Sequence, residues 1–173
     1  MKLNQRSFGK LYDKLAPKIY RFVFFKVRST ETAQDLTHDT FLKGWQYCQR
    51  NEVKFPQAIF YQVARQQIAD FWRRQKFQVV SLDAKPFEMI DDQPSLDERL
   101  AKDDELNQMF AVLATLPEDQ QDILTWRYLD GYSYRQIAKI LNKPSGTIRV
   151  AAHRALKQLK EKWQEDTTRS ERV

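Results

Sequence analysis

The sequence predicts an all-α protein made of two small helical domains joined by an acidic linker, with a helix-turn-helix in the C-terminal domain. Three observations predict this fold. Apolar residues recur at helical spacing in both halves, the periodicity is lost over residues 78–102, and 173 residues suit one or two small domains. The expected parts are therefore a first domain over residues 1–77, the linker, a second domain over residues 103–165, and a polar, flexible tail over residues 166–173.

The first two expected helices are separated by a proline. Phe8, Leu11 and Leu15 share one face of the first helix. Because proline has no backbone N–H to donate inside a helix, the first helix is expected to end before Pro17. A second helix is then predicted from Pro17 to about Val27.

The third and fourth helices are expected to begin at capping residues. Ser29 or Thr30 can cap the third helix, because a hydroxyl there accepts a hydrogen bond from the first turn. Pro56 can begin the fourth, where its missing N–H does no harm, and that helix is expected to reach about Phe77. The apolar face of the third helix comprises Ala33, Leu36, Thr37, Thr40, Phe41, Gly44, Trp45 and Cys48.

The distribution of charged residues divides the chain at the same place as the loss of helical apolar spacing. Residues 1–77 hold 15 basic and 6 acidic side chains, whereas residues 78–105 hold 3 basic and 9 acidic ones. Pro86 and Pro94 argue against a continuous helix in the linker. Its apolar residues leave two interpretations open: a loop packed on one domain, or a segment that becomes ordered on a partner.

The second domain is expected to begin with two helices, from about Asp103 to Ala114 and from Pro117 to Leu129. Gly131 suits the left-handed conformation that often ends a helix. The next helix then has to start anew after this glycine.

A helix-turn-helix is predicted to follow. Ser133 can cap a short helix, residues 142–144 form a turn around Pro144, and Ser145 can cap a second helix. The apolar stripes comprise Tyr134, Ile137, Ala138 and Leu141 on the first helix, and Ile148, Ala152, Leu156, Leu159 and Trp163 on the second. The basic outer face of the second helix favours docking in the DNA major groove. An ordinary helical hairpin with a solvated basic face is the alternative.

Composition narrows the function classes. The net charge of +6 and a pI near 9.4 suit a polyanionic partner. The single Cys48 excludes an internal disulfide framework, falls on an apolar face, and points to a reducing, cytoplasmic compartment. No signal peptide or run long enough for membrane insertion is expected. His153 has no second ligand nearby, so no metal site, cofactor or catalytic group is expected.

Residues 61–76 interleave basic with aromatic side chains. The basic ones can hold phosphates, and the rings of Tyr61 and Trp72 can stack on unpaired bases. Phe60 and Phe71 are expected in the core instead. The basic side chains are Arg65, Arg73, Arg74 and Lys76.

With these motifs in this order, the chain resembles the extracytoplasmic-function (ECF) sigma factors, the compact branch of the bacterial sigma-70 family. Residues 35–45, DLTHDTFLKGW, look like the family's helix for binding core RNA polymerase. Residues 64–74, ARQQIADFWRR, are similar to its helix for promoter melting and the −10 element. Residues 116–134 and 146–156 resemble its −35-binding domain.

The resemblance implies a transcription initiation subunit, not an enzyme, whose partners are core RNA polymerase and promoter DNA, and often an anti-sigma factor. It implies a polymerase-binding surface at Asp35, Asp39, Phe41 and Lys43. It implies −10 contacts from Lys54, Tyr61, Arg65, Gln66, Asp70, Arg73 and Arg74. It implies −35 contacts from Ser145, Thr147, Arg149, Val150, His153, Arg154 and Lys157.

Three departures from the family's pattern point to altered contacts. Asp39 stands where the family usually has Glu, and Gln66 where it often has Asn. After Arg149 many members continue Ser-Arg-Leu, whereas here the run is Val-Ala-Ala at 150–152. Fewer polar −35 contacts are therefore expected, with Val150 touching a thymine methyl.

Two other classes of function fit the sequence less well. A stand-alone helix-turn-helix regulator with an N-terminal sensor or dimerisation domain is the alternative, although a basic, aromatic helix does not suit a sensor pocket. A nucleic-acid enzyme is disfavoured, because no carboxylate cluster, metal-ligand spacing or nucleophile–base pair stands out in the sequence.

Overall fold

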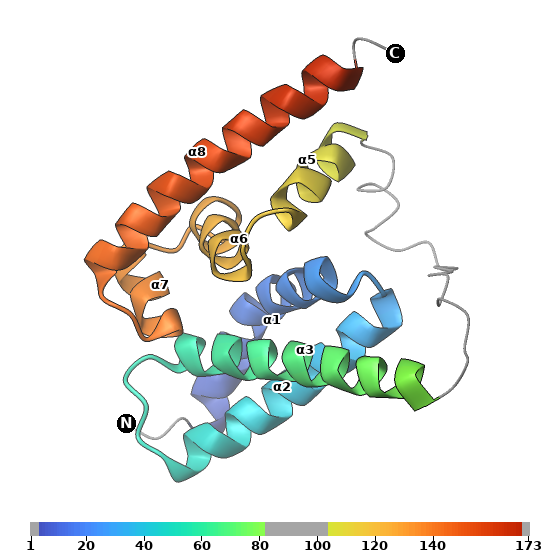
Figure 1. Cartoon of the computed structure of the whole chain (residues 1–173). Coiled ribbons are helices and arrows are strands. Elements are labelled where there is room, and N and C mark those ends of the chain that lie inside the picture. Colours follow the sequence, from blue (N-terminus) through green and yellow to red (C-terminus); the bar gives the residue numbers. More distant parts are fainter. Residues whose placement is uncertain (1–3, 82–103, 171–173) are drawn as a thin grey trace. The chain divides into compact units, whose positions relative to one another are not determined.

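A computed structural model describes residues 4–81 and 104–170, and all regular structure in these ranges is helical. The chain divides into two compact units, an N-terminal unit over Met1–Asp91 and a C-terminal unit over Asp92–Val173 (Figure 1). Most of the expected linker, from residue 82 onward, lies outside the described residues. Within these ranges no helix is both long and apolar enough to cross a membrane.

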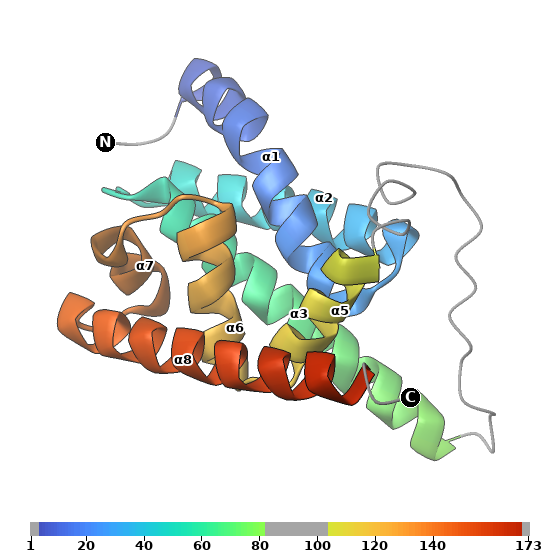
Figure 2. The same cartoon turned by 90° about the horizontal axis from the view of Figure 1, so that it is seen from above.

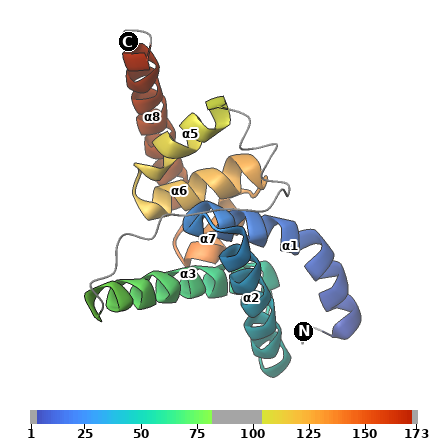
Figure 3. The same cartoon turned by 90° about the vertical axis from the view of Figure 1, so that its right-hand side faces the viewer.

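The N-terminal unit consists of α1 (Gln5–Val27), α2 (Thr30–Arg50) and α3 (Pro56–Ser81), and each helix packs against the other two (Figure 3). Phe60 lies among the rings of Phe8 and Phe41, at centroid distances of 6.2 and 5.1 Å. The fully buried side chains of this unit include Leu15, Ile19, Phe22, Val23, Cys48, Phe60, Tyr61 and Ala64.

The helix α1 is continuous, so the expectation of two helices separated at Pro17 is wrong. Pro17 lies inside the helix and removes one backbone hydrogen bond. The buried side chains of Leu15 and Ile19 flank it, and their packing on α2 and α3 holds the helix together across this gap. Asn4 caps α1, because its Oδ1 accepts from the Ser7 N–H at 2.9 Å.

The helices α2 and α3 start where the sequence indicates. Ser29 caps α2 by accepting from the Thr32 N–H at 3.3 Å, and Pro56 is the first residue of α3. The helix α3 continues to Ser81, past the expected end near Phe77 and into the expected linker. Gly44 lets α2 and α3 approach closely, because a Cβ at this position would lie 2.5 Å from the Phe60 ring.

The C-terminal unit is arranged along its longest helix. It consists of α5 (Asp104–Ala114), α6 (Glu118–Leu124), the π-helix η1 (Thr125–Leu129), α7 (Tyr134–Leu141) and α8 (Ser145–Ser170). Figure 2 shows α8 passing α7, α6 and α5 in turn, and it packs against all three. Ala155 of α8 is fully buried against Leu116 and Leu124.

One helix was expected from Pro117 to Leu129, and two elements form instead. Pro117 precedes α6, and from Thr125 the chain widens into a π-helical turn that ends with the Asp130 N–H donating to Thr125 O at 3.1 Å. The extra residue in this turn coincides with full burial of Trp126, while Tyr128 and Leu129 remain exposed.

The turns of the helix-turn-helix use residues that tolerate special conformations. Gly131 has φ +73°, and Asn142 ends α7 at φ 51° in the left-handed region. Ser133 caps α7 in a reciprocal arrangement with Gln136, as expected. Ser145 does not cap α8, because it is already the first helical residue and follows Pro144, whose carbonyl accepts from the Ile148 N–H at 3.2 Å.

Candidate nucleic-acid interface

The N-terminal half of α8 has one buried face and one exposed face. Ile148 and Ala152 are each about 1% exposed, so this face is fixed to the rest of the unit. Val150 is 51% exposed on the outer face. The other exposed side chains predicted to contact DNA are Thr147, Arg149, His153, Arg154 and Lys157, and Ser145 is half-buried. The structure therefore places the predicted −35 residues along the N-terminal half of α8.

Contacts between α6, η1 and α7 hold the helix-turn-helix in shape. Arg127 lies over the Tyr134 ring at 4.8 Å and donates to Tyr132 O at 3.2 Å. Partial burial, followed by the nearby Tyr134, raises the pKa of Tyr128 above its usual value. Lys143, in the turn between α7 and α8, forms an ion pair with Asp119 of α6 at 2.5 Å.

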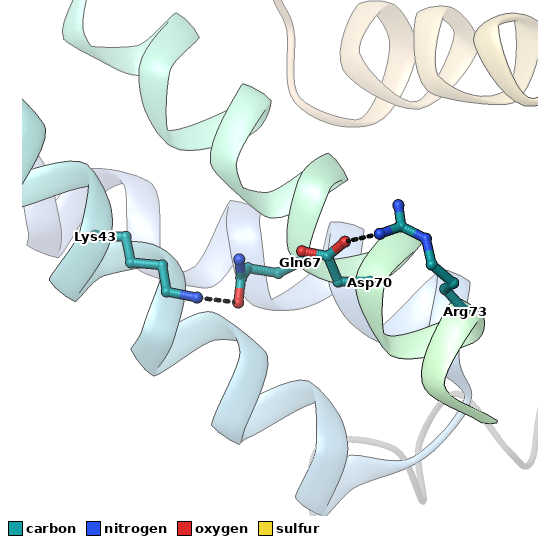
Figure 4. Close-up of polar contacts among 4 residues, drawn as sticks. All are labelled: Lys43, Gln67, Asp70 and Arg73. Atoms are coloured by element: carbon teal, nitrogen blue, oxygen red, sulfur yellow. Dashed lines mark hydrogen bonds and ion pairs between the residues drawn. The ribbon is translucent and has the colours of Figure 1, made fainter. Parts of the chain in front are cut away.

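A second group of predicted DNA-binding residues lies along α3. Asp70 Oδ1 pairs with Arg73 Nη1 at 3.1 Å on the same helix (Figure 4), while the side chain of Arg73 remains 67% exposed. Arg74 is exposed and Arg65 is half-buried. Trp72 is 47% exposed, and its ring is supported edge-on by Phe71 at 5.1 Å. A flat ring therefore stands beside basic groups, as stacking on an unpaired base requires.

Two residues near this surface complete the predicted −10 set, and a third is excluded from it. Gln66 is exposed on α3, and Lys54 is exposed in the connection between α2 and α3. Tyr61 is fully buried, with its ring edge-on to Phe22 at 5.6 Å. The expectation that Tyr61 offers its ring to a base is therefore wrong, since the ring is part of the core.

The predicted polymerase-binding residues lie on α2 with one exception. Asp35, Asp39 and Lys43 are exposed. Phe41 is only 4% exposed, because its ring packs against Tyr12 at 4.7 Å and against Phe60. Its assignment to the binding surface is wrong, and its place in the apolar face of the helix is confirmed.

One contact at this surface was not anticipated. Lys43 Nζ lies 2.7 Å from Gln67 Oε1 and so joins α2 to α3 (Figure 4). Gln67 is only 8% exposed. The sequence held a signal for this contact, since Gln67 falls on the apolar face of its helix, where a polar side chain needs a partner.

Family comparisons match both groups of residues. The Sigma-70 region 2 family matches residues 11–78, which include α2 and most of α3. The Sigma-70 region 4 family matches residues 106–159, which include the helix-turn-helix. The fold and the two exposed surfaces thus define a protein with both of these sigma-70 regions.

Individual relatives narrow the class further. The ECF RNA polymerase sigma factor BldN of Streptomyces coelicolor is 29% identical over 164 residues, which cover 88% of this chain and 59% of that protein. SigX of Bacillus subtilis, another ECF sigma factor, is 23% identical over 97% of this chain and 93% of its own length. The sigma-E factor of Escherichia coli K12 is 41% identical over 39% of this chain and 36% of its own. The chain belongs to the ECF sigma factors of the sigma-70 family.

Solved structures share the fold. The sigma factor RpoE of Bartonella quintana, solved with the anti-sigma factor NepR, matches with a TM-score of 0.70 and 22% identity over 92% of this chain and 98% of that one. CnrH, solved with the cytosolic domain of CnrY, matches with a TM-score of 0.68 and 18% identity over 94% of this chain and 91% of that one.

Proposed function

We propose that this chain directs transcription initiation by binding core RNA polymerase and contacting promoter DNA with both of its units. The observation that carries the proposal is the pairing of two exposed surfaces of different chemistry within one chain. The outer face at the start of α8 offers Arg149 and Arg154 for a duplex, and α3 offers Trp72 beside Arg73 and Arg74 for an unpaired strand.

The duplex contact belongs to α8. A helix enters the major groove with its N-terminal residues on the base edges, and Arg there pairs bidentately with guanine. Arg149 lies in the second turn of α8 and is exposed. Thr147 and His153 are exposed on the same helix and can donate to bases or phosphates.

The strand contact belongs to α3 and the connection before it. Exposed cations at Lys54, Arg73 and Arg74 can track a phosphate backbone, while Trp72 supplies the stacking surface. Gln66 offers a carboxamide for a base edge. This combination suits a separated strand better than a closed duplex, whose bases present no free faces.

The polymerase contact belongs to the exposed side of α2. Asp35, Asp39 and Lys43 form an exposed surface of mixed charge. A complementary charged surface on the polymerase would steer and orient binding. By the same reasoning, an anti-sigma protein that occludes such surfaces is proposed as a regulatory partner in the cytoplasm, in keeping with the complex solved for RpoE with the anti-sigma factor NepR.

Reconstitution tests the proposal directly. The purified chain is mixed with sigma-free core polymerase and transcribed on a library of promoter fragments, with core alone as the control. We expect a stable complex and new transcripts that share −35 and −10 sequences. A stand-alone regulator would bind duplex DNA without core and would start no transcripts with it, and that result would refute the proposal.

A further inference from the structure

An ion pair joins the turn of the helix-turn-helix to α6, and neither of its residues is among the predicted DNA contacts. Lys143 Nζ lies 2.5 Å from Asp119 Oδ2, although 24 positions of sequence separate the two residues. Lys143 directly precedes Pro144 in the turn that leads into α8, and Asp119 lies in the first turn of α6. The fold therefore creates this pair, which does not arise from neighbouring positions on one helix.

The turn does not need this ion pair to keep its shape. Asn142 takes the left-handed conformation at φ 51°, and the Lys143 N–H donates to Ala138 O at 3.0 Å. Pro144 has a restricted backbone angle, and its carbonyl accepts from the Ile148 N–H at 3.2 Å. Local bonds thus hold the backbone on both sides of Lys143, and an ion pair at the surface adds little to stability. Its effect is expected in binding instead.

Lys143 lies where a DNA backbone would pass. In a helix-turn-helix, the recognition helix places its N-terminal residues in the major groove, and the helix before it crosses the phosphate backbone. Lys143 stands between these two helices, two residues before Ser145, the first residue of α8. The next residue, Gly146, is exposed, and among the described residues a Cβ there would meet nothing within 4 Å. The helix before the turn, α7, carries two more exposed cations, Arg135 and Lys139.

The side chain of Lys143 can exchange one anionic partner for another. It is 46% exposed and the side chain of Asp119 is 40% exposed, so a phosphate can reach the ammonium group. Lysine carries its charge and three donors on a flexible stem, which can turn without a change in the backbone. Water screens the pair, so little free energy is lost when Asp119 is released. The closely spaced phosphates of a duplex attract the ammonium group more strongly than one solvated carboxylate does.

We propose that Lys143 contacts a DNA phosphate beside the −35 element, and that Asp119 weakens this contact by competing for the same ammonium group. The inference rests on the proposed duplex binding by α8 and adds a contact outside the predicted set. When DNA binds, Lys143 exchanges a carboxylate oxygen for a phosphate oxygen. Phosphate contacts carry no base information. Asp119 therefore lowers the affinity for every duplex alike, and the choice of sequence stays with the base contacts of α8.

The test measures binding of the holoenzyme, reconstituted from the full chain and core polymerase, to two short fluorescent duplexes. One duplex carries the −35 sequence shared by its transcripts, and the other carries the same bases in scrambled order. Fluorescence anisotropy is recorded over a series of salt concentrations, with core alone as the background. Lys143→Gln should weaken binding to both duplexes by a similar factor and lower the salt slope by about one. An unchanged slope would overturn the phosphate contact.

Asp119→Asn tests the competition, because it removes the charge and keeps the shape of the side chain. We expect it to tighten binding to both duplexes by about 2- to 5-fold, the factor for one exposed ion pair. Glu118→Gln is the matched control, since this exposed neighbour lies in the same first turn of α6 and loses the same charge. Among the described residues Glu118 forms no ion pair, so its effect should be smaller. Equal effects, or weaker binding by Asp119→Asn, would contradict the competition.

The double variant of Lys143→Gln with Asp119→Asn separates partner exchange from a general gain of positive charge. Without the ammonium group, Asp119→Asn should change affinity no more than Glu118→Gln does in the same background. A persisting advantage of Asp119→Asn would show that its carboxylate repels DNA directly, and it would refute the exchange. Misfolding cannot imitate the expected result for Asp119→Asn alone, because that result is tighter binding.

The outcomes separate this inference from the proposed function. If the wild-type holoenzyme binds the −35 duplex no better than the scrambled one, sequence recognition by α8 fails, and the proposed function fails with it. The Lys143 contact is still decided in that case, because a phosphate contact forms equally on the scrambled duplex. If the −35 duplex is preferred while Lys143→Gln and Asp119→Asn change nothing, only this inference is refuted.

Discussion

Lys43 Nζ donates to Gln67 Oε1 across 2.7 Å, so a residue of the proposed polymerase surface is bonded to a nearly buried residue of α3. Gln67 directly follows Gln66, which faces outward at the proposed −10 surface. A single hydrogen bond thus connects the proposed polymerase-binding surface on α2 to the helix that carries the proposed −10 surface, α3.

Lys43→Ala should lower the free energy of unfolding by about 1 kcal/mol, because the hydrogen bond is lost and Gln67 keeps a poorly solvated acceptor. Urea unfolding of Lys43→Ala, Gln67→Ala and the double variant measures the coupling, expected at about 0.5–1.5 kcal/mol. Lys14→Ala, at an exposed position of α1, is the control. Strictly additive effects would contradict a bond between the two side chains.

Gly44→Ala should destabilise the N-terminal unit by about 1–3 kcal/mol, because the new methyl group would overlap the buried Phe60 ring. Gly9→Ala is the matched control on α1, where a Cβ meets nothing within 4 Å. It should stabilise the helix by about 0.5–1 kcal/mol. Thermal or urea unfolding compares the two, and equal effects would rule out a close approach at Gly44.

Trp72→Ala should weaken single-strand binding by about 1–3 kcal/mol, the usual loss for one stacked base, with little change in stability. Fluorescence anisotropy with core and a labelled strand measures it. Leu42→Ala removes an equally exposed apolar side chain, 49% exposed, from α2 and should leave strand affinity unchanged. A similar loss in both variants would mean that Trp72 does not stack on a base.

Arg149→Ala should weaken binding to a −35 duplex by about 1–3 kcal/mol while core binding persists, since Arg149 lies on the outer face of α8. Electrophoretic mobility shift with the reconstituted holoenzyme measures the duplex contact, and gel filtration measures core binding. Lys160→Ala, about three turns further along the same helix, is the control. Loss of core binding would show that Arg149 has a different role.

Val150 should touch a thymine methyl at the −35 element. Replacing the contacted thymine by deoxyuridine removes one methyl group and should cost about 0.8 kcal/mol with wild-type chain. The same replacement should cost almost nothing with Val150→Ala, because the apolar partner is already gone. Binding measured for the four combinations gives the coupling, and an undiminished deoxyuridine effect in the variant would contradict the contact.

The sequence predicted the local signals of this fold well. The cap at Ser133, the left-handed Gly131 and the start of α3 at Pro56 were all predicted from chemistry that acts within a few residues. Pro17 misled because the local cost of a proline is offset by burial of Leu15 and Ile19, which depends on distant helices.

The resemblance to the family assigned contacts to exposed residues of the N-terminal unit, but it also assigned contacts to two aromatic residues that are buried. Phe41 lies inside the motif at 35–45 and Tyr61 three residues before the motif at 64–74, yet both are core residues. The reason is that α2 and α3 each pack against the other two helices of the unit, so both bury a broad part of their surface. For Phe41 the apolar periodicity was the better guide.

The burial of Cys48, the single cysteine of the chain, makes it a natural probe of opening. Burial raises the pKa of its thiol, so both access and thiolate fraction are low in the native unit. A thiol reagent at neutral pH should therefore modify the chain only when the N-terminal helices separate. The rate of modification, followed by mass spectrometry, would report how often that happens and whether core polymerase suppresses it, without any engineered label.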